Sequence, residues 1–163
     1  MRRSFVVFIS LFIAGALFAS GSSGSSGGNS SGGGGATKVA SSTPSAIDWY
    51  NRGFAASDAG KYQNAITDFQ QAISLKADYA EAYNMLGFST RKMGKVKDAF
   101  AYYEKALTLK PNFPEAREYY GEAYLQEGNL AKAVQQYIIL QKAGTKNAGE
   151  LLEKIDDFVN MKS

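Results

Sequence analysis

The sequence of 163 residues has no cysteine and no histidine. Without cysteine it can form no disulfide and offers no thiol nucleophile, and without histidine it lacks the commonest general base. Zinc or haem sites built from these two residues are excluded for the same reason. We therefore expect no catalytic residues, no metal site and no bound cofactor.

Other signatures of catalysis are missing as well. The long glycine tract is followed by no Lys-Ser or Lys-Thr pair opening a helix, so it is not a phosphate-binding loop. Carboxylate pairs do occur, Glu118 with Glu122 and Asp156 with Asp157, but we expect them to lie on solvated helix faces. The sequence thus favours a binding or structural protein over an enzyme.

The chain also has little excess charge of either sign. Its formal net charge is +3, and it falls to +1 if Arg2 and Arg3 are removed with the start of the chain. One small basic cluster occurs, made of Arg91, Lys92, Lys95 and Lys97. Because no aromatic residues alternate with these cations along a stripe, we expect solvated surface there and no nucleic-acid partner.

The first residues are typical of an exported protein. Two arginines follow Met1, and an apolar run then extends from Phe5 to Phe18. This run is shorter than the roughly 17–25 residues that a spanning helix needs, so a cleaved secretory signal over residues 1–20 is predicted. The alternative is an uncleaved N-terminal anchor, the one case in which we expect membrane contact. Export without cysteine favours the periplasm or cell envelope of a bacterium.

Residues 21–45 form a linker of low complexity. From Gly21 to Gly35 the chain contains only Gly, Ser and Asn29. Such a segment has no apolar area to offset the entropy of ordering it, so we predict a disordered linker. Its reach is on the order of 25–30 Å. It serves either as a passive spacer or as a tether that holds the folded part away from a membrane or wall.

The stretch from Ala46 to Thr145 repeats itself every 34 residues. Five columns of equivalent residues carry the repeat: Gly53/Gly87/Gly121, Gly60/Gly94/Gly128, Ala65/Ala99/Ala133, Phe69/Tyr103/Tyr137 and Tyr62/Val96/Leu130. Self-similarity at this period indicates a solenoid whose unit is one helical hairpin.

The spacing inside one unit explains the columns. In residues 80–113, apolar positions recur at helical spacing up to Gly94, resume at Val96 and stop before Pro111. The unit is therefore two antiparallel helices joined by a short turn. Small residues such as Gly87 and Ala99 let the helices approach closely, and a larger side chain there would cost roughly 1–3 kcal/mol. Gly94 is expected to end the first helix with a positive φ.

These columns resemble the tetratricopeptide repeat, and the second unit carries the pattern best. Its Leu86-Gly87, the small and aromatic positions of its second helix and Pro111 all match. Arg52 in the first unit, and Arg117 and Leu140 in the third, depart from the pattern. The resemblance implies an all-α fold, a right-handed α-solenoid of three antiparallel helical hairpins with a capping helix.

The units are expected at residues 46–79, 80–113 and 114–147, followed by a capping helix within 148–163. Ser45 and Asp48 provide a helix start signal for the first unit. Asn147 is expected to cap the last helix, whose apolar stripe includes Leu151 and Ile155. This helix would cover Leu140, because a solenoid needs a half-polar end for solubility. The alternative is an amphipathic helix that binds a partner.

With catalysis and nucleic-acid binding disfavoured, we expect the protein to bind a partner protein. Solenoids present extended concave faces to such partners. In the tetratricopeptide family the first helix of each hairpin lines that face, which implies a groove at the matching positions. These are Ile47, Tyr50, Asn51, Phe54, Glu81, Asn84, Met85, Phe88, Arg91, Glu115, Glu118, Tyr119, Glu122 and Leu125. One end of this set is aromatic and the other is acidic. We expect a protein or peptide partner with an apolar segment and a basic one, unless the aromatic residues pack only against neighbouring helices.

The resemblance also implies what the groove does not bind. Family members that grip the carboxylate at the end of a chaperone use cationic groove residues, whereas Tyr50, Phe54, Met85, Glu115 and Tyr119 occupy those positions here. No chaperone carboxylate clamp is predicted. The function we expect is a non-enzymatic adaptor or scaffold for an envelope complex, monomeric or weakly oligomeric. The alternative is a structural or self-associating envelope component.

Overall fold

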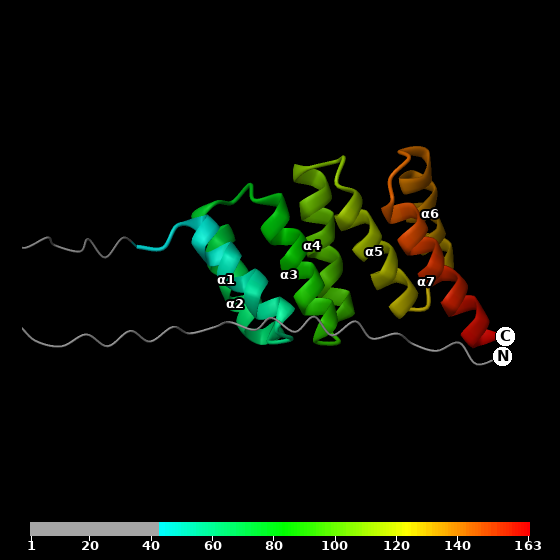
Figure 1. Ribbon diagram of the computed structural model, residues 1–163, viewed down its shortest axis with the longest axis horizontal. Coiled ribbons are helices and arrows are strands. Elements are labelled where there is room, and N and C mark those ends of the chain that lie inside the picture. The colour runs from blue at the N-terminus through cyan, green and yellow to red at the C-terminus, as the bar shows by residue number, and fades with distance from the viewer. Residues whose placement is uncertain (1–42) are drawn as a thin grey trace, which may run out of the picture. The chain divides into compact units, whose positions relative to one another are not determined.

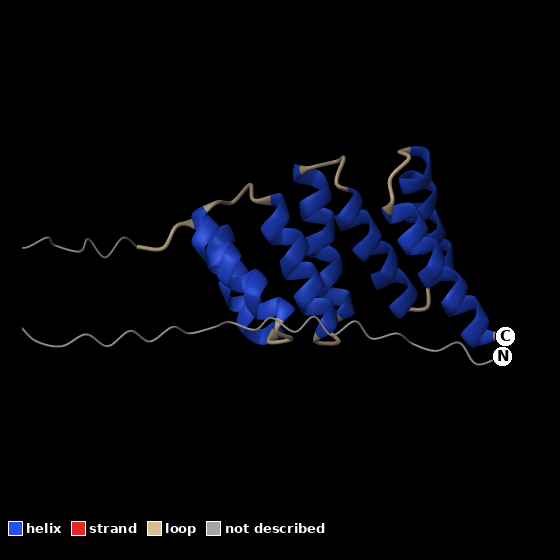
Figure 2. Cartoon of the chain, in the orientation of Figure 1, coloured by secondary structure: helices blue, strands red, loops and turns tan. Residues whose placement is uncertain are grey.

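The computed structural model describes residues 43–163. The expected signal or anchor at 1–20 and the linker up to residue 42 lie outside the described residues. The described part folds into seven α-helices, shown in Figures 1 and 2. They are α1 (Ala46–Asp58), α2 (Tyr62–Leu75), α3 (Ala80–Lys92), α4 (Val96–Leu109), α5 (Pro114–Gln126), α6 (Leu130–Lys142) and α7 (Asn147–Lys162).

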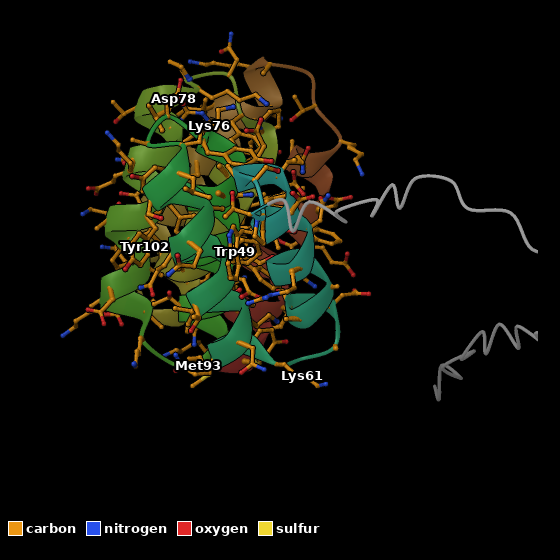
Figure 3. All side chains as sticks on the ribbon, turned by 90° about the vertical axis from the view of Figure 1, so that its left-hand side faces the viewer. Trp49, Lys61, Lys76, Asp78, Met93 and Tyr102 are labelled. Carbon is orange, nitrogen blue, oxygen red and sulfur yellow. The ribbon has the colours of Figure 1, made fainter. Side chains whose placement is uncertain are left out.

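The helices pair into three hairpins, α1 with α2, α3 with α4 and α5 with α6, and α7 packs on α5 and α6. The turns within hairpins lie at one end of the helices and the links between hairpins lie at the other. Figure 3 shows this arrangement, with Lys61 and Met93 at one end and Lys76 and Asp78 at the opposite end. The predicted all-α solenoid is confirmed.

Local signals set the helix ends. The side chain of Ser45 accepts a hydrogen bond from the backbone N–H of Asp48, and the Asp48 carboxylate accepts one from the backbone N–H of Ser45. This capping box starts α1 and satisfies N–H groups that have no partner within the helix. Gly94, after α3, has a φ of 80°, as predicted. Glycine adopts this conformation without the steric cost that other residues meet.

The small residues make the contact inside each hairpin tight. A Cβ atom added to Gly53 would lie 2.9 Å from the ring of Phe69, and one added to Gly87 would lie 2.8 Å from the ring of Tyr103. Both rings are fully buried, so they cannot move aside into solvent. Glycine at the first helix and an aromatic ring at the second therefore fit together, as the repeat columns predict.

The apolar core runs from one hairpin to the next. Phe69 of α2 clusters with Leu86 of α3, and further along Leu140 of α6 clusters with Leu151 of α7. Each of these four side chains is at most 1 % exposed. Every hairpin thus buries its apolar face against the first helix that follows it, which is why a terminal helix is needed.

The helix α7 covers the third hairpin, and it differs from the prediction at its start. A Cβ atom on Gly121 would lie 2.5 Å from Leu151, so here a leucine of α7 takes the place that an aromatic ring takes in the first two hairpins. The N-cap of α7 is Lys146, and Asn147 lies inside the helix. The expectation that Asn147 caps this helix is wrong, because its side-chain amide is hydrogen-bonded to Glu118 of α5 instead.

Among residues 43–163, no helix is both long and apolar enough to cross a lipid bilayer.

Candidate functional site

The first helices of all three hairpins meet around one cavity, which we call the groove cavity. Its volume is about 300 Å³. Phe54 from α1, Met85 and Phe88 from α3, and Glu115 and Tyr119 from α5 line it. All five are among the predicted groove residues. Side chains from helices far apart in the sequence thus share one surface, which a solenoid curved toward its first helices produces.

Aromatic side chains form the floor of this cavity. The ring centroid of Phe88 lies 5.1 Å from that of Tyr119 and 6.3 Å from that of Tyr62. Tyr62, on α2, also lines the cavity and is not among the predicted groove residues. The ammonium nitrogen of Lys92 lies 5.4 Å from the centre of the Phe88 ring. Phe54 remains 48 % exposed at the edge. Apolar area in contact with water, next to aromatic rings that pack edge-on or tilted, is what a partner side chain can cover.

The tyrosines of the groove stay protonated at neutral pH. Burial, with a smaller effect from nearby carboxylates that include Glu115, raises the pKa of Tyr50 to about 12. The same causes raise the pKa of Tyr119 to about 12. Both hydroxyl groups therefore remain neutral and able to donate hydrogen bonds.

Several predicted groove residues do not line the groove cavity. Tyr50 packs against Phe69 and Tyr79, with ring centroids 5.7 and 5.1 Å apart. Asn84 is 1 % exposed, and its Oδ1 atom has no hydrogen-bond partner among the described residues. Ile47 and Asn51 are exposed on α1, away from the groove cavity. Glu81, on α3, binds Lys110 at 2.8 Å, and this contact lowers the pKa of Glu81.

A second cavity, of about 580 Å³, lies between α5 and α7. We call it the acidic cavity, because Glu115, Glu118 and Glu150 line it together with Lys110 and Lys146. Both lysines pair with carboxylates, Lys110 with Glu81 outside the cavity and Lys146 with Glu150 in its lining. Glu115 and Glu118 have no ion-pair partner within residues 43–163.

Glu118 is buried, contrary to the expectation of a solvated carboxylate pair. It accepts a hydrogen bond from the side-chain amide of Asn147, which joins α5 to α7. Burial raises the pKa of Glu118 to about 7, and the neighbouring carboxylates of Glu150 and Glu122 act in the same direction. This burial could not be predicted from the sequence, because it depends on how α7 packs against α5.

Arg91 is likewise buried, so the expectation that the whole basic cluster is solvated is wrong at this residue. Its Nη2 atom lies 2.6 Å from Oε2 of Glu122, and its Nε donates to the hydroxyl group of Tyr103. A third cavity of about 280 Å³, beside this pair, includes Leu125 and reaches Phe158 of α7. The charge of Glu122 is therefore already balanced inside the protein.

Among the described residues, no three acidic side chains gather closely enough to hold a metal ion.

Comparisons with known proteins agree with this geometry. A family model described as TPR repeat matches residues 57–94, and one described as Tetratricopeptide repeat matches residues 91–155. No curated protein is significantly similar to the chain.

Several solved structures share the fold. The second TPR domain of the human RPAP3 protein, in complex with an HSP70 peptide, is 26% identical, with a TM-score of 0.62 over 68% of this chain and 94% of that one. The chaperone SycD of Yersinia enterocolitica, in complex with a peptide of the translocator YopD, is 23% identical, with a TM-score of 0.61 over 71% and 89%. MamA is 34% identical, with a TM-score of 0.55 over 70% of this chain and 62% of its own length. Residues 57–155 of this chain therefore belong to the tetratricopeptide repeat family.

Proposed function

We propose that this protein is an exported adaptor that holds a segment of a partner protein in its groove and supports assembly of an envelope complex. The groove cavity carries the proposal, because all three hairpins contribute to it and Phe54 and Phe88 offer apolar area there. Tetratricopeptide repeats are typically non-catalytic interaction modules. In keeping with this, the similar domain of human RPAP3 holds a peptide.

The partner segment is apolar at one end and basic at the other. Its apolar side chains lie against Phe54, Phe88 and Tyr119, which combine large contact area with few rotatable bonds. Its basic group lies in the acidic cavity beside Glu115, whose charge has no ion-pair partner among the described residues. Glu118 lines the same cavity, but its raised pKa leaves it only partly charged at neutral pH. Glu122 contributes less than its charge suggests, since Arg91 already pairs with it.

Calorimetric titration of the full chain with designed peptides tests this chemistry. Peptides that join a Leu-Trp segment to an Arg-Lys segment should bind, and peptides with Glu in place of Arg and Lys should bind at least tenfold more weakly. Phe54→Ala should weaken binding about tenfold, which corresponds to about 1.4 kcal/mol. Leu75→Ala is the matched control, because Leu75 is a similarly exposed apolar residue outside the groove. Equal binding by all peptides would refute the charge preference.

The partner itself can be captured in cells. A photoreactive amino acid at Phe54 should crosslink one envelope protein, and the same group at Leu75 should not. If both positions crosslink the same proteins to the same extent, the groove is not the binding surface.

We still predict that the groove does not bind the terminal carboxylate of a chaperone. The first TPR domain of RPAP3 binds the HSP90 peptide SRMEEVD. In this chain Glu115 stands where a clamp needs a cation, and its charge would repel a terminal carboxylate. We expect this peptide to give no measurable binding in calorimetry, and an affinity in the micromolar range would show that our assignment of groove positions is wrong.

Cell fractionation and N-terminal sequencing of the chain test export. We expect the mature chain in the periplasmic or envelope fraction to begin near residue 20 or 22. A full-length chain retained in the membrane would support the anchor instead, and a chain found in the cytoplasm would overturn export.

A self-associating envelope component is the alternative, and exposed Leu152, Val159 and Met161 on α7 favour it. Light scattering separates the two, because the adaptor is expected to be a monomer without its partner. A stable oligomer that Val159→Ser dissociates would support self-association.

A further inference from the structure

The outer side of the third hairpin carries a cavity that the groove does not use. We call it the outer cavity. Its volume is about 370 Å³. Its lining includes Pro111 and Phe113 from the link before α5, Pro114 at the start of α5, Ile139 and Leu140 near the end of α6, and Ala143 directly after α6. It shares no lining residue with the groove cavity, although Asn112, Phe113 and Pro114 also line the acidic cavity.

Comparison with the second hairpin explains how this cavity arises. The residues 34 positions earlier than Arg117, Ile139 and Ala143 are Tyr83, Lys105 and Leu109. In the second hairpin Tyr83 and Leu109 pack on the core, and the ammonium nitrogen of Lys105 lies 6.0 Å from the centre of the Tyr83 ring.

The third hairpin carries side chains of different size and charge at these three positions. Ala143 replaces a leucine and is too small to fill the same space. Ile139 replaces a lysine and is left 41 % exposed at the edge of the cavity. Arg117 replaces the tyrosine and brings a positive charge to the wall. The result is an apolar cavity with a cation at its rim.

The residues that line the outer cavity carry charge of one sign only. Arg117 is the one charged side chain in its lining, and no carboxylate lines it. Lys142, the last residue of α6, lies between the lining residues Leu140 and Ala143 in the sequence and is exposed. The guanidinium of Arg117 donates to the backbone oxygen of Pro111 and to Gln136, which leaves other N–H groups free for an anion.

We infer that the outer cavity is a second docking site, which receives one bulky apolar side chain flanked by acidic residues from another protein. A cavity of about 150 Å³ is enough for benzene, so the outer cavity accommodates an aromatic side chain with its backbone. Anchors of this kind, seated in a pocket and surrounded by a polar rim, dominate many interfaces.

Two other occupants fit the charges less well. Residues 1–47 of this chain contain Arg2, Arg3 and Lys38 but no acidic residue. A second copy would offer the acidic helix α7, but its aromatic residue, Phe158, packs on the core of its own chain and is not free to act as an anchor.

The probe for this site is a fluorescent dodecapeptide with one Trp flanked on each side by two Glu residues. Bound to the full chain, it should increase in anisotropy and shift the methyl NMR signals of Ile139 and Leu140. The same peptide with Ala for Trp, or with Lys for Glu, should bind at least tenfold more weakly.

Two variants restore what the second hairpin has at these positions. Ala143→Leu fills the cavity and Ile139→Lys places a cation on its apolar edge, and each should weaken binding at least tenfold. Ile139 is exposed, so its replacement leaves the fold intact even if Ala143→Leu does not. Phe54→Ala, in the groove, should leave this binding unchanged, which separates the outer site from the proposed function.

Several results would overturn the inference. These are no binding of the acidic Trp peptide at millimolar concentration, binding that Ile139→Lys leaves unchanged, and equal binding of the Lys peptide. A tighter interaction with a peptide of residues 1–20 would make this chain's own start the occupant. Dimers that Ile139→Lys dissociates would make it a second copy.

Discussion

Arg91 and Glu122 form an ion pair in which the Arg91 Nη2 atom lies 2.6 Å from the Glu122 Oε2 atom and both side chains are largely removed from water, at 8% and 19% exposure. The pair connects α3 of the second hairpin to α5 of the third. Burying the guanidinium would favour its loss of charge, but the pair and the Tyr103 hydroxyl keep the pKa of Arg91 raised. The two hairpins are thus joined by charge as well as by apolar contact.

Breaking this pair from one side should destabilise the protein strongly. Arg91→Leu leaves Glu122 buried without its cation, and we expect a loss of about 3–5 kcal/mol in the free energy of unfolding. Urea denaturation followed by circular dichroism measures it. The double variant Arg91→Leu with Glu122→Leu should recover much of the loss, because no uncompensated charge is left. A single variant as stable as the parent would show that the pair is solvated.

Stability should depend on pH through Glu118. Its native pKa is about 7, above its ordinary value of 4.5, so between these values the folded protein holds a proton that the unfolded chain has released. The stabilisation is fully present below about pH 4.5 and is lost as the pH rises to about 7. We therefore compare the unfolding temperature of the parent with that of Glu118→Gln at each pH. The difference, parent minus variant, should be larger near pH 5 than near pH 8.

Glu118→Gln is the suitable comparison, because glutamine stays neutral and can still accept a hydrogen bond from Asn147. Glu153→Gln, on the exposed side of α7, should retain the pH dependence of the parent. If Glu118→Gln shows the same pH dependence of the unfolding temperature as the parent, a group other than Glu118 causes that dependence.

Two phenylalanines of the first hairpin should differ in how much they contribute to stability, because one lies in the core and the other on the surface. Phe69 is fully buried and Phe54 is 48 % exposed. Phe69→Ala is expected to cost about 3–5 kcal/mol of unfolding free energy, because it leaves a cavity. Phe54→Ala should cost about 1 kcal/mol, since half of its surface is already in water. Equal costs in urea denaturation would place Phe54 in the core and remove it from the groove.

Much of this fold follows from the sequence, because the repeat columns are physical requirements. In the first two hairpins Gly53 and Gly87 make room for the rings of Phe69 and Tyr103, and Gly94 recurs since the turn needs a positive φ. Five of the predicted groove residues line one cavity for the same reason: helical spacing fixes which side chains share a face.

The electrostatics of the site could not be predicted in the same way. The sequence shows Arg91, Glu118 and Glu122 as charged residues on helix faces, and such residues are usually solvated. Their burial follows from contacts between different hairpins and with α7, through Glu122 and Asn147. The outer cavity also depends on a comparison of hairpins in three dimensions, since Ala143 is unremarkable by itself.

The central claim is that the hairpins close through contacts that admit no side chain at the repeated glycines. The most direct test compares Gly87→Ala with Gly149→Ala by thermal and urea unfolding. Both positions are helical, Gly87 in the middle of α3 and Gly149 in the first turn of α7. A Cβ at Gly87 meets the ring of Tyr103, whereas a Cβ at Gly149 meets nothing within 4 Å. We expect Gly87→Ala to be less stable than Gly149→Ala by roughly 1–3 kcal/mol. Equal stability of the two variants would contradict the account.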